Sequence, residues 1–237
     1  MSYFVRTFVR ITKNILRDFV EAHKFRKNSL YKHMVQKSFE TSIEFANHNL
    51  INTRRFNNRK DLIKFCINNS PKDGIYAEFG VYKGESIKII AQSFKNKNIY
   101  GFDSFDGLPE DWGTVMPQGS FGLNRLPEVP NNVKLIKGLF KDTLPNFLSV
   151  NIENFSFIHV DCDLYQSTKD IFDIIETRIT SGTVILFDEL INVVDWQSHE
   201  YRAFQEFAER TGIKFKYIAY HSEQTIGAGT EVTVQII

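Results

Sequence analysis

Short uninterrupted apolar runs alternate with helix-length amphipathic stretches along the last three quarters of the chain. The runs predict buried strands at residues 75–79, 98–103, 133–136, 155–161 and 183–188, and residues 214–220 and 231–237 predict a closing β-hairpin. Helical periodicity covers residues 59–68, 85–94, 167–180 and 200–211. Alternating strands and helices are typical of a parallel sheet. We therefore expect an α/β, Rossmann-like fold whose seven-stranded, mostly parallel sheet ends in an antiparallel hairpin.

The first 48 residues follow a different pattern and predict a helical, basic, amphipathic extension. Within residues 3–22, Phe and Ile recur at helical spacing on one face and Arg and Lys on another. Residues 1–40 carry nine Lys/Arg and three Asp/Glu, while the rest of the chain is mildly acidic. Three interpretations stay open for residues 3–22: a packing helix, a helix on the surface of a membrane, or an arm that recruits a phosphorylated or lipid-linked glycan.

Composition and charge limit the partners and the cellular location that we expect for this protein. The formal net charge of +1, the acidic body and the lack of an N-P-P-Y type motif argue against a nucleic-acid partner. The two cysteines form no zinc or disulfide pattern, and basic residues interrupt every apolar stretch near the N-terminus. These features predict a cytoplasmic protein, with peripheral contact to the inner face of the membrane if residues 3–22 bind lipid.

The segment 109–132 stands outside the alternation of strands and helices. It contains four of the six prolines of the chain, three glycines, and the apolar side chains of Trp112, Met116 and Phe121. A long irregular connection inside a compact domain is usually functional or mobile. Two interpretations stay open: the segment is a lid over an active site, or it is a loop that packs on the surface of the domain.

The turn after the first buried strand has the composition of a ligand-binding loop. The strand ends in Glu78-Phe79-Gly80, and Gly84 follows four residues later. Glycine lets a backbone approach a ligand closely, but this spacing differs from the G-x-G-x-x-G that holds a pyrophosphate. An acidic strand end suits the ammonium group of S-adenosylmethionine. We expect this cofactor to contact Glu78, Phe79, Gly80, Val81, Tyr82, Gly84, Glu85 and Ser86.

Later strand ends extend the expected cofactor site. Asp103 ends the second strand about 20 residues beyond the glycine turn, where a carboxylate can accept hydrogen bonds from ribose hydroxyls. Gly138 and Phe140 follow the third strand, where a ring can flank adenine. Any one of these is weak evidence, because a lone Asp often caps a helix. Their order on successive strands predicts a class I methyltransferase domain over residues 49–237. The expected cofactor contacts here are Asp103, Ser104, Phe105, Gly107, Gly138, Phe140 and Asp161.

Four carboxylates gather at the ends of the next two predicted strands. Asp161 and Asp163 follow one strand, and Asp188 and Glu189 end the other. Such a group is costly unless something positive lies within it. Carboxylate oxygens are the ligands that hard divalent cations prefer, so Mg²⁺ is the expected metal. A metal that lowers the pKa of an alcohol hydroxyl, with a nearby carboxylate to take the proton, would suit O-methylation.

In four segments the sequence resembles the macrocin O-methyltransferase family, typified by the mycinamicin and novobiocin sugar O-methyltransferases. The segments are Glu78 to Ser86, Gly101-Phe102-Asp103-Ser104-Phe105-Asp106-Gly107-Leu108-Pro109, His159-Val160-Asp161-Cys162-Asp163-Leu164-Tyr165 and Phe187-Asp188-Glu189. The resemblance runs from about residue 50 to the C-terminus. It implies Mg²⁺-dependent methyl transfer from S-adenosylmethionine to a sugar hydroxyl.

The resemblance also implies roles for the carboxylates. Asp161, Asp188 and Glu189 would bind the metal, and Asp163 would be the general base. Many family members carry Asp where this chain has Glu189, which is one methylene longer. Adjacent strand residues face opposite sides, so Asp188 and Glu189 can share a metal only if the chain turns there. The basic N-terminal extension does not match the antibiotic-tailoring members and leaves the acceptor open.

These observations predict a sugar O-methyltransferase whose acceptor is a glycan, a polysaccharide or a glycosylated natural product, acting as a homo-oligomer. A catechol-type metal-dependent O-methyltransferase is the alternative enzyme, since it uses similar carboxylates on the same fold. A non-catalytic S-adenosylmethionine-binding module is the alternative outside enzymes. The intact Asp161, Asp163 and Asp188 argue against that module.

Overall fold

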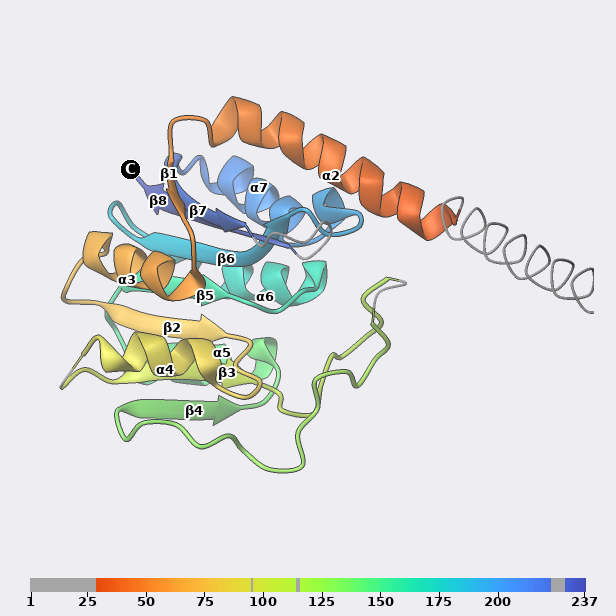
Figure 1. Ribbon diagram of the computed structural model, residues 1–237. Helices are drawn as coiled ribbons and strands as arrows, with labels where there is room; N and C mark the ends of the chain where they lie inside the picture. The colour runs from red at the N-terminus through yellow and green to blue at the C-terminus, as the bar shows by residue number, and fades with distance from the viewer. Residues whose placement is uncertain (1–28, 95, 114–115, 223–228) are drawn as a thin grey trace, which may run out of the picture.

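The computed structural model describes residues 29–94, 96–113, 116–222 and 229–237, and these form one eight-stranded sheet with helices on both faces (Figure 1). The strand order is β1-β7-β8-β6-β5-β2-β3-β4. β8 is antiparallel to β6 and β7, and all other neighbouring strands are parallel. The chain leaves β2 for β3 and β4 on one side, then returns to β5 on the other. This reversal is the point at which open α/β sheets bind ligands, at the carboxyl ends of the strands.

The elements fall close to the predicted ranges. The strands are β1 (Arg54–Phe56), β2 (Ile75–Phe79), β3 (Ile99–Asp103), β4 (Val133–Lys137), β5 (Phe155–Val160), β6 (Val184–Ile191), β7 (Phe215–Ser222) and β8 (Thr230–Ile236). The α-helices are α2 (Leu30–Asn49), α3 (Arg59–Asn69), α4 (Glu85–Gln92), α5 (Phe140–Val150), α6 (Tyr165–Ile175) and α7 (Glu200–Thr211). Two short 3-10 helices, η1 (Glu176–Arg178) and η2 (Trp196–Ser198), complete the described part.

The central strands are apolar because helices cover them on both sides. Every residue of β2 and β5 is buried, as parallel strands inside an α/β fold require. α3 and α4 cover one face through an aliphatic group that includes Leu62, Ile63 and Ile87. α5, α6 and α7 cover the other through a group that includes Phe172 and Phe204. Burying one such side chain stabilises the fold by about 1.5–3 kcal/mol, so the edge where the strands end is held firmly.

The predicted Rossmann-like fold is confirmed, with two additions. The sheet has eight strands rather than seven, because Arg54–Phe56 pairs in parallel with β7 as β1. This strand is only three residues long and two of them are arginines, so it shows no apolar run. α5 was also not predicted, since Pro145 lies inside it and interrupts the helical pattern.

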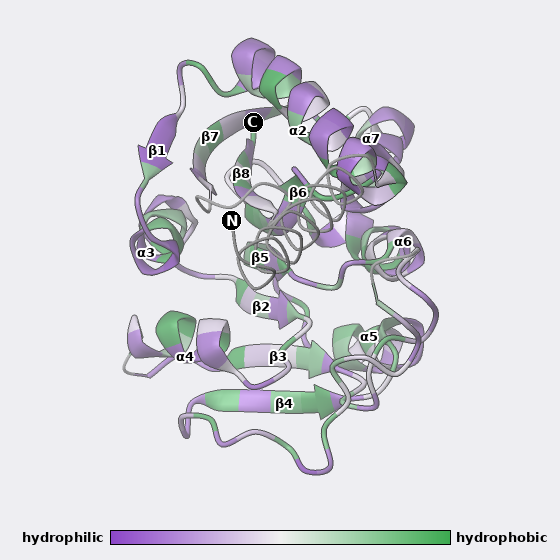
Figure 2. Cartoon of the chain, turned by 45° about the vertical axis from the view of Figure 1, so that its right-hand side comes forward, coloured by the Kyte–Doolittle hydropathy of each residue, from purple (hydrophilic) through white to green (hydrophobic). Residues whose placement is uncertain are grey.

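The predicted basic helix at residues 3–22 lies outside the described residues. From Ser29, which caps α2 by accepting a hydrogen bond from the Lys32 amide, the chain is helical to Asn49. Phe45 packs against Trp196, Tyr201 and Tyr217, while the first turns of α2 extend beyond the sheet (Figure 1) and are largely hydrophilic (Figure 2).

No helix in the described part of the chain is long and apolar enough to cross a membrane. Membrane contact through residues 3–22 and a homo-oligomeric state stay predictions.

The segment 109–132 connects β3 to β4 on the side where the strands end (Figure 1). Main-chain hydrogen bonds hold the start of this segment in a loop. The Leu108 amide donates to the Ser120 carbonyl at 2.9 Å, and the Gly119 amide donates back to Leu108 at 2.9 Å. Further along, Val129 lies against Gly84 of the predicted cofactor turn. The segment therefore lies against the carboxyl end of the sheet.

Candidate active site

At the end of β2 the chain passes close to its neighbours. The Gly80 amide donates to the Phe102 carbonyl of β3, and the Asp161 amide donates to Phe79, each at 2.9 Å. Gly80 has φ of 90°, and a Cβ there would lie 1.6 Å from the Asp161 carbonyl oxygen. Glycine is required at position 80 mainly because the main chain of Asp161, just after β5, lies so close. This close approach also places the predicted cofactor turn beside the acidic end of β5.

Asp103 joins the turns after β2 and β3. Its Oδ2 accepts hydrogen bonds from the amides of Val81 and Tyr82, both at 2.8 Å, and its Oδ1 accepts one from the Phe105 amide at 2.6 Å. Phe105 holds φ of 56°, which this bond helps to fix. Asp103 thus shapes the predicted cofactor turn itself. Its hydrogen bonds to a ribose stay a prediction.

A cavity of about 440 Å³ opens at the carboxyl end of the sheet. It brings together two predicted groups of residues that lie far apart in the sequence. The predicted residues on its wall are Gly80, Tyr82, Asp103, Ser104, Gly107, Gly138, Phe140, Asp161, Asp163, Asp188 and Glu189. The expected cofactor contacts and the expected metal and base carboxylates therefore share one space.

The other predicted cofactor residues lie behind or beside that wall. The side chain of Glu78 is fully buried and accepts a hydrogen bond from the Ser86 hydroxyl at 2.7 Å. Phe79, Val81 and Phe105 are core residues. Gly84 and Glu85 open α4, outside the cavity lining. Direct contact of a ligand with these seven residues stays a prediction, and in this structure Glu78 supports the site from below.

Arg59 occupies the middle of the acidic cluster, which the sequence did not indicate. It is the first residue of α3, after the N-cap Asn58. Its Nη2 lies 3.0 Å from Asp161 Oδ2 and 2.5 Å from Asp188 Oδ1. Its Nε lies 3.0 Å from Glu231 Oε1, on β8. Burial lowers the pKa of Arg59, but these carboxylates outweigh burial and raise it, so the guanidinium stays charged.

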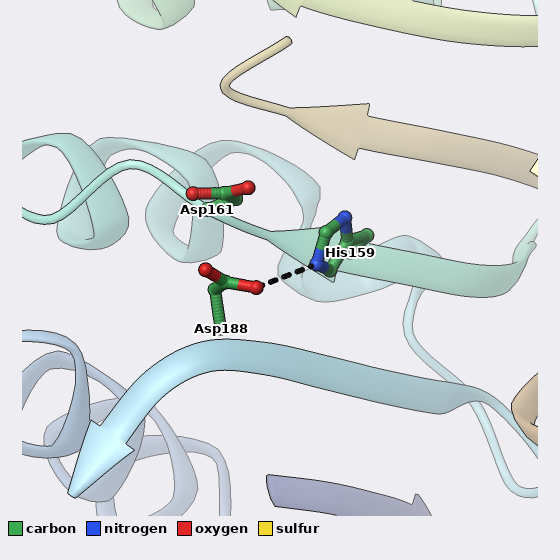
Figure 3. Close-up of side chains that lie close together, drawn as sticks. All are labelled: His159, Asp161 and Asp188. Atoms are coloured by element: carbon green, nitrogen blue, oxygen red, sulfur yellow. Dashed lines mark ion pairs between the residues drawn. The ribbon is translucent and has the colours of Figure 1, made fainter. Parts of the chain in front are cut away.

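His159 lies beside Asp161 and Asp188, and its ring faces Asp188 (Figure 3). Its Nδ1 lies 3.2 Å from Glu78 Oε2, and its Nε2 lies 3.6 Å from Asp188 Oδ1. Burial lowers the pKa of His159, but the two carboxylates outweigh it and raise the pKa to about 10. One donor atom from each of His159, Asp161 and Asp188 lies within 4.8 Å of the others. These three side chains therefore form a group that could hold a metal ion; while its imidazole is protonated, His159 has no free lone pair and can only orient Asp188.

Asp163, Glu189 and Glu200 form the unpaired part of the cluster. Among the described residues, the ion pairs of Arg59 and His159 reach none of these three. Burial, reinforced by neighbouring charges, raises the pKa of Asp163 to about 6 and the pKa values of Glu189 and Glu200 well above their usual range. Glu189 Oε2 and Glu200 Oε2 are buried without a hydrogen-bond partner in the described structure. Carboxyl groups here therefore outnumber the positive groups that pair with them.

The backbone of β6 explains how two adjacent acidic residues, Asp188 and Glu189, both reach the cavity. Its pairing with β8 is regular up to Phe187 and shifts register before Ile191. Asp188 and Glu189 lie in this irregular stretch, and both line the cavity. The irregular pairing of β6 therefore accompanies the placement of two neighbouring carboxyl groups in one cavity.

Sequence patterns match known methyltransferases over this region. Residues 77–190 match a family model described as a methyltransferase domain. The 8-demethyl-8-(2,3-dimethoxy-alpha-L-rhamnosyl)-tetracenomycin-C 4'-O-methyltransferase of Streptomyces olivaceus is 25% identical over 183 residues, 65% of this chain and 67% of that protein. Demethyldecarbamoylnovobiocin O-methyltransferase of Streptomyces niveus is 25% identical over 197 residues, 68% of this chain and 70% of that protein.

Solved structures share the fold. The calicheamicin methyltransferase CalS11 superposes with a TM-score of 0.57 and 20% identity, covering 88% of this chain and 93% of that one. The O-methyltransferase NovP superposes with a TM-score of 0.53 and 22% identity, covering 75% and 78%. The domain match, the O-methyltransferase relatives and the fold agree. Residues 77–190 therefore form a methyltransferase domain, and together with the two relatives they support an S-adenosylmethionine-dependent O-methyltransferase.

For this methyltransferase the predicted resemblance to the novobiocin-type enzymes is confirmed, as is the prediction of an enzyme rather than a non-catalytic module. The sequence reasoning missed Arg59, Glu200 and Glu231 as members of the site. Glu231 alone left a signal, because a charged residue inside the apolar, β-branched strand Thr230–Ile236 is unusual unless it has a buried partner. His159 lies in the buried strand β5 and is ion-paired with Glu78 and Asp188.

Proposed function

We propose that this methyltransferase methylates a sugar hydroxyl on a glycan or a glycosylated small molecule, with Mg²⁺ as its metal and Asp163 as general base. The observation that carries the proposal is the shared cavity. The ends of β2, β3 and β4 supply one part of its wall, and the acidic ends of β5 and β6 supply another. A methyl donor and an acceptor hydroxyl can therefore meet without crossing bulk water.

The proposed reaction is an in-line displacement. The acceptor oxygen forms a bond to the methyl carbon while the bond between that carbon and sulfur breaks, which leaves S-adenosylhomocysteine. The hydroxyl proton passes to the carboxylate of Asp163, whose pKa of about 6 suits a base that works near neutrality. Asp163 holds φ of 63°, which aims it by a strained backbone at the end of β5. The cavity walls hold both reactants in position, and this positioning lowers the activation barrier of the methyl transfer.

The donor set of the cluster fits a divalent cation. Two basic side chains, Arg59 and His159, lie among seven carboxyl groups, and the Glu189 Oε2 and Glu200 Oε2 atoms have no hydrogen-bond partner in the described structure. The seven carboxyl groups belong to Glu78, Asp161, Asp163, Asp188, Glu189, Glu200 and Glu231. Asp161, Asp188 and Glu189 would hold the ion through oxygen, the atom that Mg²⁺ prefers. When bound, Mg²⁺ would lower the pKa of an acceptor hydroxyl and neutralise the cluster.

The acceptor side of the cavity supports a sugar. Segment 109–132 supplies Trp112 and Phe121 to the wall, and α6 supplies Gln166 and Asp170. The Trp112 ring is buried, and its indole Nε1 has no hydrogen-bond partner in the described structure. Aromatic faces with nearby polar groups suit the C–H and O–H surfaces of a pyranose. The names of the two relatives support the same class, since one names a rhamnosyl-tetracenomycin and the other a demethyldecarbamoylnovobiocin.

Replacing Trp112 by alanine is expected to raise KM for a glycoside acceptor at least about tenfold, because the stacking surface and an indole donor are lost. The KM for S-adenosylmethionine should change little. The matched control is Leu126→Ala, an exposed residue of the same segment that does not line the cavity. Steady-state kinetics with each substrate varied in turn measures both constants. An unchanged acceptor KM in Trp112→Ala would show that segment 109–132 is a packed excursion and not a wall of the acceptor site.

An acceptor panel tests the proposed function. The panel contains nucleotide-activated deoxysugars, rhamnosides and simple catechols, each assayed for S-adenosylhomocysteine with Mg²⁺ and again with excess EDTA. We expect turnover with one of the sugars, loss of it in EDTA, and restoration by Mg²⁺. Turnover with catechols and none with any sugar would favour the catechol-type alternative, and turnover on a sugar that survives EDTA would remove the metal from the mechanism.

A further inference from the structure

One nitrogen of Arg59 bridges two carboxylates that we assign to the metal. Nη2 is within 3.0 Å of Asp161 Oδ2 and 2.5 Å of Asp188 Oδ1, so it occupies the place that a cation shared by these two residues would take. Nearby, His159 is fully buried, with its Nε2 3.6 Å from the same Asp188 oxygen. Arg59 therefore supplies the positive charge that lies directly between the two carboxylates.

We propose that Arg59 is a built-in counter-ion, which holds Asp161 and Asp188 together in the metal-free enzyme and withdraws from both when a divalent cation binds. This inference rests on the proposed metal-dependent function. The Nη2 atom fills the position between the two oxygens that a bridging divalent cation would take, and like charges a few ångströms apart repel in a partly buried site. Metal binding at this position therefore competes with the two Arg59 ion pairs.

The contacts of Arg59 allow such a movement. Its Nε holds Glu231 Oε1 at 3.0 Å, on a carboxylate that does not belong to the proposed metal ligands. Glu231 is in turn fixed by His221, whose Nδ1 lies 2.5 Å from Oε2. The Arg59 side chain is 37% exposed and lines the open cavity. Rotation of the guanidinium about the Glu231 contact can release Nη2 from both aspartates while α3 stays in place.

Mn²⁺ titration of the cofactor-free enzyme, by electron paramagnetic resonance of the free ion, tests the inference. We expect Arg59→Met to bind Mn²⁺ at least about tenfold more tightly than the natural protein, since the competing charge is gone. Arg59→Lys should stay within about threefold, because one charge remains. The matched control is Arg55→Met, an exposed arginine of β1, which should bind as the natural protein does. Equal or weaker Mn²⁺ binding by Arg59→Met would overturn the inference and leave the metal proposal standing.

A measurement on the natural protein covers the case in which Arg59→Met does not fold. Phenylglyoxal modifies accessible arginines, and peptide mass spectrometry gives the rate at Arg59. We expect that rate to rise several-fold when Mg²⁺ saturates the enzyme, while the rate at Arg55 stays constant. A rate at Arg59 that does not rise, in a protein that binds Mn²⁺, would contradict the withdrawal. Failure of the natural protein and all variants to bind Mn²⁺ would overturn the metal proposal itself, and the inference with it.

Discussion

Replacing Asp163 by asparagine is expected to lower the turnover number by a factor of about 10²–10⁴, the usual contribution of a general base. Asparagine keeps the size of the side chain but cannot take the hydroxyl proton. Binding of S-adenosylmethionine, measured by calorimetry, should stay within about threefold, since the change removes no part of the cofactor turn. Single-turnover methyl transfer measures the chemical step directly.

The control for this variant is Asp142→Asn, an exposed carboxylate at the start of α5 that does not line the cavity. It should turn over as the natural enzyme does. Full turnover by Asp163→Asn would remove the base assignment, and the proton would then have to leave through another group of the cluster. Glu189 would be the first to test, because it lines the same cavity and also has a raised pKa.

Gly80→Ala is expected to destabilise the fold by about 3 kcal/mol or more, since a backbone clash adds to the cost of a left-handed conformation. The new Cβ would lie 1.6 Å from the Asp161 carbonyl oxygen, which is part of the main chain and cannot rotate away. Gly212→Ala is the matched control, because Gly212 also has positive φ but has nothing within 4 Å of a Cβ. Urea denaturation gives the free energy of unfolding for both variants.

Gly212→Ala should lose only about 1–2 kcal/mol, the cost of the backbone conformation alone. Equal losses in the two variants would show that the β2 and β5 ends separate easily. That result would weaken the account of the site, because the same close approach brings the cofactor turn beside Asp161.

The sequence could predict the places where strands end, and through them most of the cavity wall. Apolar runs such as 75–79 and 155–160 must be buried, and parallel connections bring their carboxyl ends to one edge. Asp103, Asp161 and Asp188 follow those runs directly, so their meeting is a consequence of topology. Glu78 shows the limit of this reasoning, since a residue at a strand end can face the core instead of the ligand.

The remaining features depend on contacts between distant elements, which no local pattern records. Arg59 starts a helix after an ordinary N-cap, and nothing at that position indicates that it reaches Asp161, Asp188 and Glu231 across the sheet edge. β1 forms because β7 offers an open edge, not because its own three residues favour a strand. The sequence predicted a cation among these carboxylates; in the structure the guanidinium of Arg59 lies between Asp161 and Asp188, and a metal ion stays a prediction.

The central claim, that methyl donor and divalent cation share the cavity at the ends of β2 to β6, is tested most directly by a crystal structure with S-adenosylhomocysteine and Mn²⁺. Anomalous scattering locates Mn²⁺ without reference to any model of the site. We expect an anomalous peak between Asp161 and Asp188, with Glu189 in reach and Arg59 turned towards Glu231. The nucleoside should lie against Gly80, Asp103 and Gly138. A peak outside this cavity, or none at saturating Mn²⁺ with the nucleoside bound, would contradict it.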